Sequence, residues 1–283
     1  MVVVLAAVES SGRIRMSTLQ SHGLIEDLPA DAVFVPDVAR LQVHDPDPDL
    51  LRRNCVIAWD NGPQTRAINL LRAQLRKRLD VKRTSRIGVT SAEPDAGKSF
   101  ITVNLAFALA RIEGQQVALF DFDLRRPTVA RRLGIESDVG IENWLAGEVD
   151  DLATVGRRIG DSALSVYIAT GQHPRATELI ASARFNALVA GMAALPGSTI
   201  VLCDLPPAFV SDEAMIAIER LDGYIHVIDE GITPRRQAEE LRAMMAPAVC
   251  IGAVLNRYNG RWNDSYGSYA ARKYARYYDD PKS

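Results

Sequence analysis

The stretch that decides the fold is SAEPDAGKSF, residues 91–100, which follows a short apolar run and precedes the apolar segment ITVNLAFALA, residues 101–110. A Gly-Lys-Ser triplet at a strand-to-helix turn offers successive backbone N–H groups and a helix N-terminus to an anion. Lys98 can reach the β- and γ-phosphates of a nucleotide, and the Ser99 hydroxyl can bind Mg²⁺. Ala92 replaces the usual first glycine of this pattern, yet the flanking segments favour a phosphate-binding loop.

Outward from this loop, short apolar runs alternate with longer segments of helical periodicity. The apolar runs are IGVT (87–90), VALFDFD (117–123), LSVYIAT (164–170), TIVLCD (199–204), YIHVI (224–228) and VCIGAVL (249–255). The expected helices cover residues 65–79, 98–112, 176–194, 211–220 and 233–246. Apolar strands separated by helices are typical of a parallel sheet covered on both faces. We therefore expect a doubly wound, mainly parallel α/β domain of the P-loop NTPase type over residues 61–256.

Acidic residues follow two of the apolar runs. Asp121 and Asp123 end the second run, and strand alternation sends both side chains to the same side. In doubly wound sheets the carboxyl ends of the strands are where ligands bind. Such a pair can hold Mg²⁺ and accept a proton from a nucleophile. Asp204 ends the run TIVLCD, the usual position of a carboxylate that faces Mg²⁺ in P-loop proteins.

The two ends of the chain differ in composition from this domain. Residues 24–50 are rich in Asp and Pro, so residues 1–60 are predicted to form a flexible, partly disordered N-terminal arm. Residues 257–283 are polar and hold six of the eight tyrosines, and they are predicted to form a Tyr-rich C-terminal tail. A tail of this composition cannot build a core of its own.

Composition excludes several classes of function. The net charge of −2 over 283 residues gives no bulk attraction to nucleic acid. The three cysteines have no spacing typical of metal ligands or of a disulfide framework, which fits a reducing, cytoplasmic compartment. No stretch approaches the roughly 20 apolar residues that a membrane-spanning helix needs.

Three motifs in this order and spacing resemble the bacterial tyrosine kinases of capsule and exopolysaccharide synthesis. The motifs are SAEPDAGKSF, VALFDFDLRRP and TIVLCDLPP, and the resemblance extends over about residues 65–256. MinD-like and ParA-like ATPases share the expected fold, but they carry a signature lysine where this chain has Glu93. Leu205 stands where the kinases have the Thr of D-T-P-P. The kinases also carry a helix motif, E-x-x-R-x-x-R, that docks one subunit on the next. Its three defined positions are here Arg66, Asn69 and Arg72, so only the last residue of the motif is kept. The second departure implies altered contacts between subunits.

The resemblance implies an ATP-dependent protein-tyrosine autokinase that regulates polysaccharide polymerisation and export, with ATP and Mg²⁺ as cofactors. Lys98, Asp121, Asp123 and Asp204 would be catalytic, with either Asp121 or Asp123 accepting the tyrosine proton, and Ser99, Asp121 and Asp204 would bind the metal. The implied nucleotide-binding residues are Pro94, Asp95, Ala96, Gly97, Lys98, Ser99, Phe100 and Arg125. The implied autophosphorylation sites are Tyr266, Tyr269, Tyr274, Tyr277 and Tyr278.

The resemblance also implies partners. A membrane-embedded chain-length (co-polymerase) protein would activate the kinase and hold it at the inner face of the cell membrane, and a cognate tyrosine phosphatase would reverse the modification. A homo-oligomer is possible, and no nucleic acid is expected. Two other functions remain open at this point: a MinD/ParA-like ATPase without kinase activity, and a nucleotide-binding pseudokinase scaffold.

Overall fold

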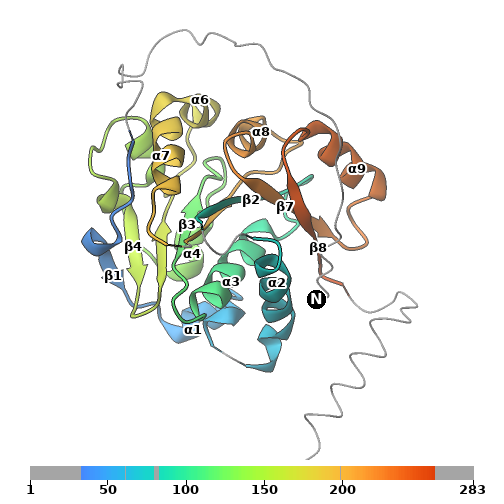
Figure 1. The fold of residues 1–283 in the computed structure, drawn as a ribbon, viewed down its shortest axis with the longest axis horizontal. Helices are drawn as coiled ribbons and strands as arrows, with labels where there is room; N and C mark the ends of the chain where they lie inside the picture. Colours follow the sequence, from blue (N-terminus) through green and yellow to red (C-terminus); the bar gives the residue numbers. More distant parts are fainter. Residues whose placement is uncertain (1–32, 61, 80–82, 198, 259–283) are drawn as a thin grey trace, which may run out of the picture.

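The computed structural model describes residues 33–60, 62–79, 83–197 and 199–258, which form one eight-stranded sheet in the order β1-β4-β5-β3-β6-β2-β7-β8 (Figure 1). Neighbouring strands run parallel except β4 and β5, which are antiparallel. The expected doubly wound, mainly parallel fold is confirmed. The strands are β1 (Gln42–His44), β2 (Ser85–Ser91), β3 (Val117–Asp121), β4 (Gly156–Ile159), β5 (Leu164–Tyr167), β6 (Ile200–Asp204), β7 (Gly223–Asp229) and β8 (Cys250–Asn256).

Helices cover both faces of the sheet, with α2 and α3 on one side and α6 to α9 on the other (Figure 1). The α-helices are α1 (Pro48–Arg53), α2 (Arg66–Arg76), α3 (Lys98–Ala110), α4 (Val129–Leu133), α5 (Ile141–Leu145), α6 (Ala176–Ala181), α7 (Ala183–Ala193), α8 (Glu213–Ile218) and α9 (Arg235–Met244). Short 3-10 helices are η1 (Val38–Arg40), η2 (Ile57–Trp59), η3 (Pro63–Thr65) and η4 (Leu152–Val155). None of the helices in the described part of the chain combines the length and apolar character that crossing a bilayer requires.

Strand β3 shows how one apolar run serves two cores. Val117 and Leu119 point into the core that α2 and α3 cover, whereas Ala118 and Phe120 point into the core under α6 to α9. The strand needs apolar residues at every position because its two faces alternate. This is the physical reason why the central strands were recognisable as continuous apolar runs.

The expected helix over residues 176–194 is two helices, α6 and α7, with a break at Ser182. The Ser182 backbone is extended, with φ −71° and ψ 161°, and its hydroxyl accepts a hydrogen bond from the Phe185 backbone N–H at 3.1 Å. A serine in this conformation caps the N-terminus of the helix that follows. The apolar periodicity continues through the cap, so periodicity alone did not reveal the break.

The structure differs from the prediction that residues 1–60 are a partly disordered arm, because residues 33–60 pack onto the domain. Strand β1 pairs with β4 at one edge of the sheet, and Leu51, Val56 and Ala58 are buried in the core. Asp47 accepts a hydrogen bond from the Asp49 backbone and caps α1, whose first residue is a proline. Aspartate at the cap and proline at the first turn start a helix. Residues 1–32 lie outside the described residues.

Leu205 is completely buried, in the apolar core that also contains residues of α8. A Cβ atom on Gly88 of β2 would lie 2.7 Å from a methyl carbon of Leu205, so the leucine occupies space that the glycine leaves free. Gly88 and Leu205 therefore have complementary shapes in the core. The leucine at position 205, where the kinases have threonine, fills space beside Gly88.

The segment around Phe34 rests on α7. The Phe34 backbone N–H donates to the Ala187 carbonyl at 3.2 Å, and its ring packs edge-on against Trp144 with ring centroids 4.9 Å apart. A Cβ atom on Gly191 would overlap the Phe34 carbonyl oxygen. Only glycine at position 191 lets the backbone around Phe34 approach the helix this closely.

We therefore predict that Gly191→Ala destabilises the protein. Helix propensity alone would favour alanine by about 1 kcal/mol, but relieving the overlap with Phe34 should cost more, so the free energy of unfolding should fall by about 1–3 kcal/mol. Urea unfolding measures this change. The variant Ala190→Gly, at an exposed position of the same helix, measures how much the alanine–glycine difference in helix propensity alone changes the free energy of unfolding. A Gly191→Ala variant more stable than the wild type would contradict this packing.

Candidate active site

The loop between β2 and α3 turns through two residues with positive φ, Asp95 at 58° and Gly97 at 94°. Gly97 is the N-cap of α3. The loop is held from β8, because the Asn256 side-chain amide donates to the Ala96 carbonyl at 2.9 Å. A Cβ atom on Gly97 would overlap that amide nitrogen. Glycine is therefore required here both by the left-handed backbone and by the closeness of the Asn256 side chain.

Lys98 and Asp123 form a buried ion pair beside this loop. The Lys98 Nζ lies 3.8 Å from an Asp123 carboxylate oxygen, and the side chains are only 8% and 6% exposed. Burial raises the pKa of Asp123 above its ordinary value, although the positive charge of Lys98 opposes the shift. The pair thus combines a poorly hydrated cation with a carboxylate that binds a proton more readily than usual.

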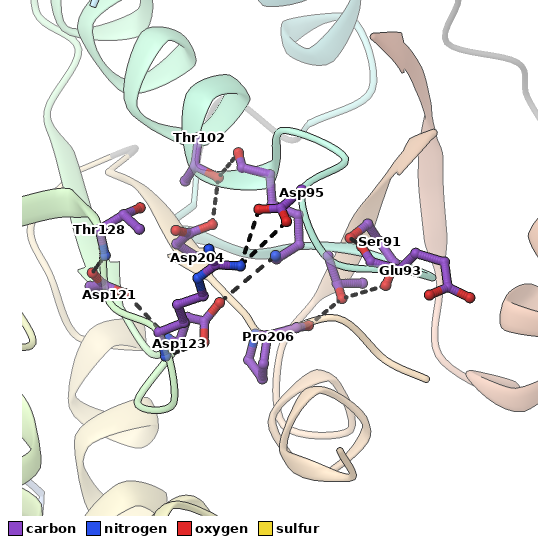
Figure 2. Close-up of polar contacts among 12 residues, drawn as sticks. Ser91, Glu93, Asp95, Thr102, Asp121, Asp123, Thr128, Asp204 and Pro206 are labelled. Carbon is purple, nitrogen blue, oxygen red and sulfur yellow. Dashed lines mark hydrogen bonds and ion pairs between the residues drawn. The ribbon is translucent and has the colours of Figure 1, made fainter. Parts of the chain in front are cut away.

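Asp204 ends β6, directly beside the end of β3 in the sheet. One of its carboxylate oxygens accepts a hydrogen bond from the Thr102 hydroxyl at 3.1 Å, and the other is buried and has no hydrogen-bond partner. Burial raises the pKa of Asp204 to about 6, although Lys98 and a hydrogen bond from Ser99 oppose the shift. Figure 2 shows Thr102, Asp204, Asp121 and Asp123 gathered in this region.

Asp121 is turned toward the loop that follows β3. Its carboxylate accepts hydrogen bonds from the backbone N–H groups of Asp123, Thr128 and Val129, at 3.2, 3.2 and 3.1 Å. Burial, together with the charges of Asp204 and Asp123, raises the pKa of Asp121 well above its ordinary value. Asp121 therefore shapes the loop and belongs to the buried acidic cluster.

The residues present fit a magnesium ion bound together with a nucleotide. In the described residues, no group of three or more His, Cys, Asp or Glu side chains is arranged to hold a metal by itself. Protein-bound Mg²⁺ usually keeps several waters and takes one or two carboxylates plus phosphate oxygens. The unpaired oxygen of Asp204, on a carboxylate whose pKa Ser99 lowers, suits that mode of binding. A cation there would also relieve the repulsion among the carboxylates.

The other predicted site residues take different positions. Pro94 and Asp95 are exposed at the tip of the loop, whereas Ala96 is buried within it. Phe100 is half-buried and packs against the core of α2 and α3. Arg125 donates from Nε to Glu213 at 2.8 Å. The five predicted tail tyrosines lie outside the described residues: Tyr266, Tyr269, Tyr274, Tyr277 and Tyr278.

Sequence reasoning missed three residues that position the site. Asn256 holds the loop, Thr102 binds Asp204, and Glu213 holds Arg125. Asn256 carried a signal, because it is a polar residue directly after an apolar run, at the edge where the other site residues lie. Thr102 and Glu213 lie inside expected helices, and nothing in the sequence around them indicated a role in the site.

The raised pKa of Asp204 predicts that this carboxylate costs stability. A carboxyl group with a raised folded-state pKa contributes stability below its unfolded value near 3.8, and this contribution is lost as pH rises through about 6. Asp204→Asn should therefore raise the free energy of unfolding above pH 7, by up to about 3 kcal/mol, with little change near pH 4. Urea unfolding between pH 4 and 8 measures this difference.

Asp222→Asn is the matched control with the opposite sign. Burial opposes ionisation of Asp222, but hydrogen bonds from Arg86 outweigh it and lower its pKa. Its ionised form stabilises the fold above pH 4, so this variant should lose stability at pH 7. If Asp204→Asn were equally destabilising at pH 7, the electrostatic account of the site would be wrong.

Comparison with known proteins agrees with this geometry. The family model described as CobQ/CobB/MinD/ParA nucleotide binding domain matches residues 87–277. The tyrosine-protein kinase YwqD of Bacillus subtilis is 29% identical over 65% of this chain and 77% of its own length. The succinoglycan biosynthesis transport protein ExoP of Rhizobium meliloti is 30% identical over 68% of this chain but only 25% of its own.

A solved structure supports the same assignment. The VpsO kinase domain is 27% identical, with a TM-score of 0.60 over 75% of this chain and 98% of that domain. The resemblance in the three motifs is thereby confirmed. The chain belongs to the CobQ/CobB/MinD/ParA nucleotide-binding family and, within it, to the bacterial tyrosine-protein kinases.

Proposed function

We propose that this protein transfers the γ-phosphoryl group of ATP to tyrosine hydroxyls, first those of its own C-terminal tail, and so regulates exopolysaccharide or capsule polymerisation and export. The observation that carries the proposal is the buried pairing of Lys98 with Asp123 beside Asp204, at the mouth of a phosphate-binding loop. Phosphoryl transfer relies on such positioned charges more than on covalent chemistry by the protein.

Each residue then has a role in the reaction. Lys98 and the loop N–H groups bind the phosphates. Ser99 and Asp204 would hold Mg²⁺ directly or through water, with Asp121 next to Asp204 on the neighbouring strand. When bound, Mg²⁺ neutralises charge that develops on the phosphate oxygens. The tyrosine oxygen bonds to the γ-phosphorus, the bond from that phosphorus to the β,γ-bridging oxygen breaks, and ADP leaves.

Asp123 is the proposed acceptor of the tyrosine proton. Its pKa is raised by burial, which favours proton uptake. The alternative, Asp121, has its carboxylate engaged by three backbone N–H groups, whereas Asp123 accepts such a bond from Arg126. A general base must be able to turn an oxygen toward the proton that it accepts. These contacts support Asp123 as the base and Asp121 as the residue that shapes its loop.

We further propose a membrane-embedded chain-length protein as activator, which places the kinase at the inner face of the membrane, and a cognate phosphatase as antagonist. The motif resemblance supports these partners. Any homo-oligomer would use contacts other than those of the kinase helix motif. On α2, Arg72 donates to the Ala108 carbonyl at 3.0 Å, and Asn69 accepts from Arg111. These side chains are engaged within the chain.

We predict that Lys98→Met abolishes tyrosine phosphorylation without unfolding the protein. The ammonium group is needed for phosphate binding, and the methionine side chain fills a similar volume at this buried position. Mass spectrometry of the protein after incubation with ATP and Mg²⁺ measures phosphotyrosine, and circular dichroism checks the fold. Undiminished phosphotyrosine in the folded variant would refute the kinase assignment.

A second prediction concerns the tail. Conversion of the five predicted sites, Tyr266, Tyr269, Tyr274, Tyr277 and Tyr278, to Phe should remove most phosphotyrosine. Each phosphate adds about −1.5 to −2 charges. A phosphorylated tail should therefore be repelled by the Asp121 and Asp123 carboxylates of a neighbouring subunit, and any assembly held together by a tail in that site should loosen. Phosphopeptide mapping and light scattering with and without ATP measure the two effects.

The matched control for the tail variant is Tyr167→Phe. Tyr167 is fully buried, with a hydroxyl that has no hydrogen-bond partner, so it should not be a phosphorylation site. This variant should keep wild-type phosphotyrosine. Full phosphorylation of the five-site variant, or an assembly size that ignores ATP in every variant, would show that the tail is neither substrate nor switch.

A further inference from the structure

An exposed ion pair joins the phosphate-binding loop to the loop after β3. A single guanidinium nitrogen of Arg126, Nη1, lies 3.2 and 3.3 Å from the two carboxylate oxygens of Asp95. The side chains are 72% and 77% exposed. Ion pairs this exposed contribute little to the stability of a fold. Stabilisation of the fold is therefore not a sufficient reason for this contact.

The position of Arg126 relates it to the phosphate machinery. Its backbone N–H donates to one oxygen of Asp123 at 3.0 Å, and the other oxygen of that carboxylate lies 3.8 Å from the Lys98 Nζ. The backbone of Arg126 is thus held next to the buried ion pair, while its guanidinium lies exposed beside Asp95. Asp95 comes three residues before Lys98, in the turn whose N–H groups receive an anion.

The neighbouring arginine is held differently. Arg125 donates to Glu213, whose side chain is only 2% exposed and which also accepts from the Thr177 hydroxyl at 2.9 Å. To move Arg125 would leave a buried carboxylate without its cation, and that is costly. Of the two arginines after Asp123, Arg126 is therefore the one that can exchange its partner at low cost.

We propose that Arg126 is a phosphate-binding residue of this site, and that Asp95 holds its guanidinium until the terminal phosphate of a nucleoside triphosphate competes for it. The proposal rests on the proposed function in taking the ligand to be ATP. A guanidinium binds a phosphate through two parallel N–H donors, whereas Asp95 engages a single nitrogen. The γ-phosphate also carries more negative charge than the carboxylate, and ADP lacks this group, so the exchange favours ATP over ADP.

The test is calorimetric titration of the full chain with ATP and with ADP, each with Mg²⁺. Arg126→Ala should weaken ATP binding about tenfold, the loss expected for one charged hydrogen-bonding group, and change ADP binding by less than about threefold. Asp95→Asn should tighten ATP binding severalfold, because asparagine tolerates the positive φ of Asp95 but does not compete for the guanidinium. In the double variant the gain from Asp95→Asn should vanish.

The matched control is Arg40→Ala, which removes an exposed ion pair with Asp151 on the β4 side of the sheet. Its nucleotide binding should equal that of the wild type. Three results would overturn the proposal: equal losses for ATP and ADP in Arg126→Ala, no loss in that variant, or a gain from Asp95→Asn that persists without Arg126. Failure of the wild-type chain to bind any nucleotide would instead refute the proposed function on which this inference rests.

Discussion

The repulsion among three buried carboxylates is the constraint on which the site depends. Asp121, Asp123 and Asp204 lie at the ends of β3 and β6, each almost completely buried, and Lys98 stands beside them. Burial raises the pKa of each, and the charges of neighbouring cluster carboxylates raise the pKa of Asp121 and of Asp204 further. A folded protein tolerates such a cluster only if the rest of the domain supplies the stability, which here comes from two apolar cores on either side of the sheet. This acidic cluster beside Lys98 suits the edge of the sheet to a cation bound together with a nucleotide.

The sheet order brings the parts of this site together. The phosphate-binding loop follows β2, Asp204 ends β6, and Asp121 ends β3, and these three strands are neighbours in the order β3-β6-β2. Because they are parallel, their carboxyl ends meet at one edge. Strand β8, farther along the same sheet, adds Asn256, whose amide holds the loop that carries Lys98. The sheet order thus brings Lys98 and Asp204, more than a hundred positions apart in the chain, to the same edge.

The central strands, the loop and the acidic cluster could be predicted because each leaves a local mark on the sequence. Gly97, Lys98 and Ser99 are adjacent in the chain, and the carboxylates directly follow apolar runs. The N-terminal segment could not be recognised, since β1 has three residues and α1 six, too few for a periodic pattern. Its place was set by tertiary contacts, such as that between Phe34 and Gly191. The partners of the two arginines after Asp123 also lay beyond sequence reasoning, because Asp95 and Glu213 meet them only in the folded chain.

The fate of the γ-phosphoryl group separates the two activities that this fold could support. A kinase transfers it to tyrosine, whereas a MinD-like ATPase transfers it to water. The direct measurement is to incubate the full chain with Mg²⁺ and ATP labelled in the γ-phosphate, and to determine how the label divides between protein tyrosine and inorganic phosphate. We expect label on tyrosines within residues 257–283, and we expect it to be lost in the Lys98→Met variant. ATP turnover in which all label appears as inorganic phosphate, with none on tyrosine, would contradict it.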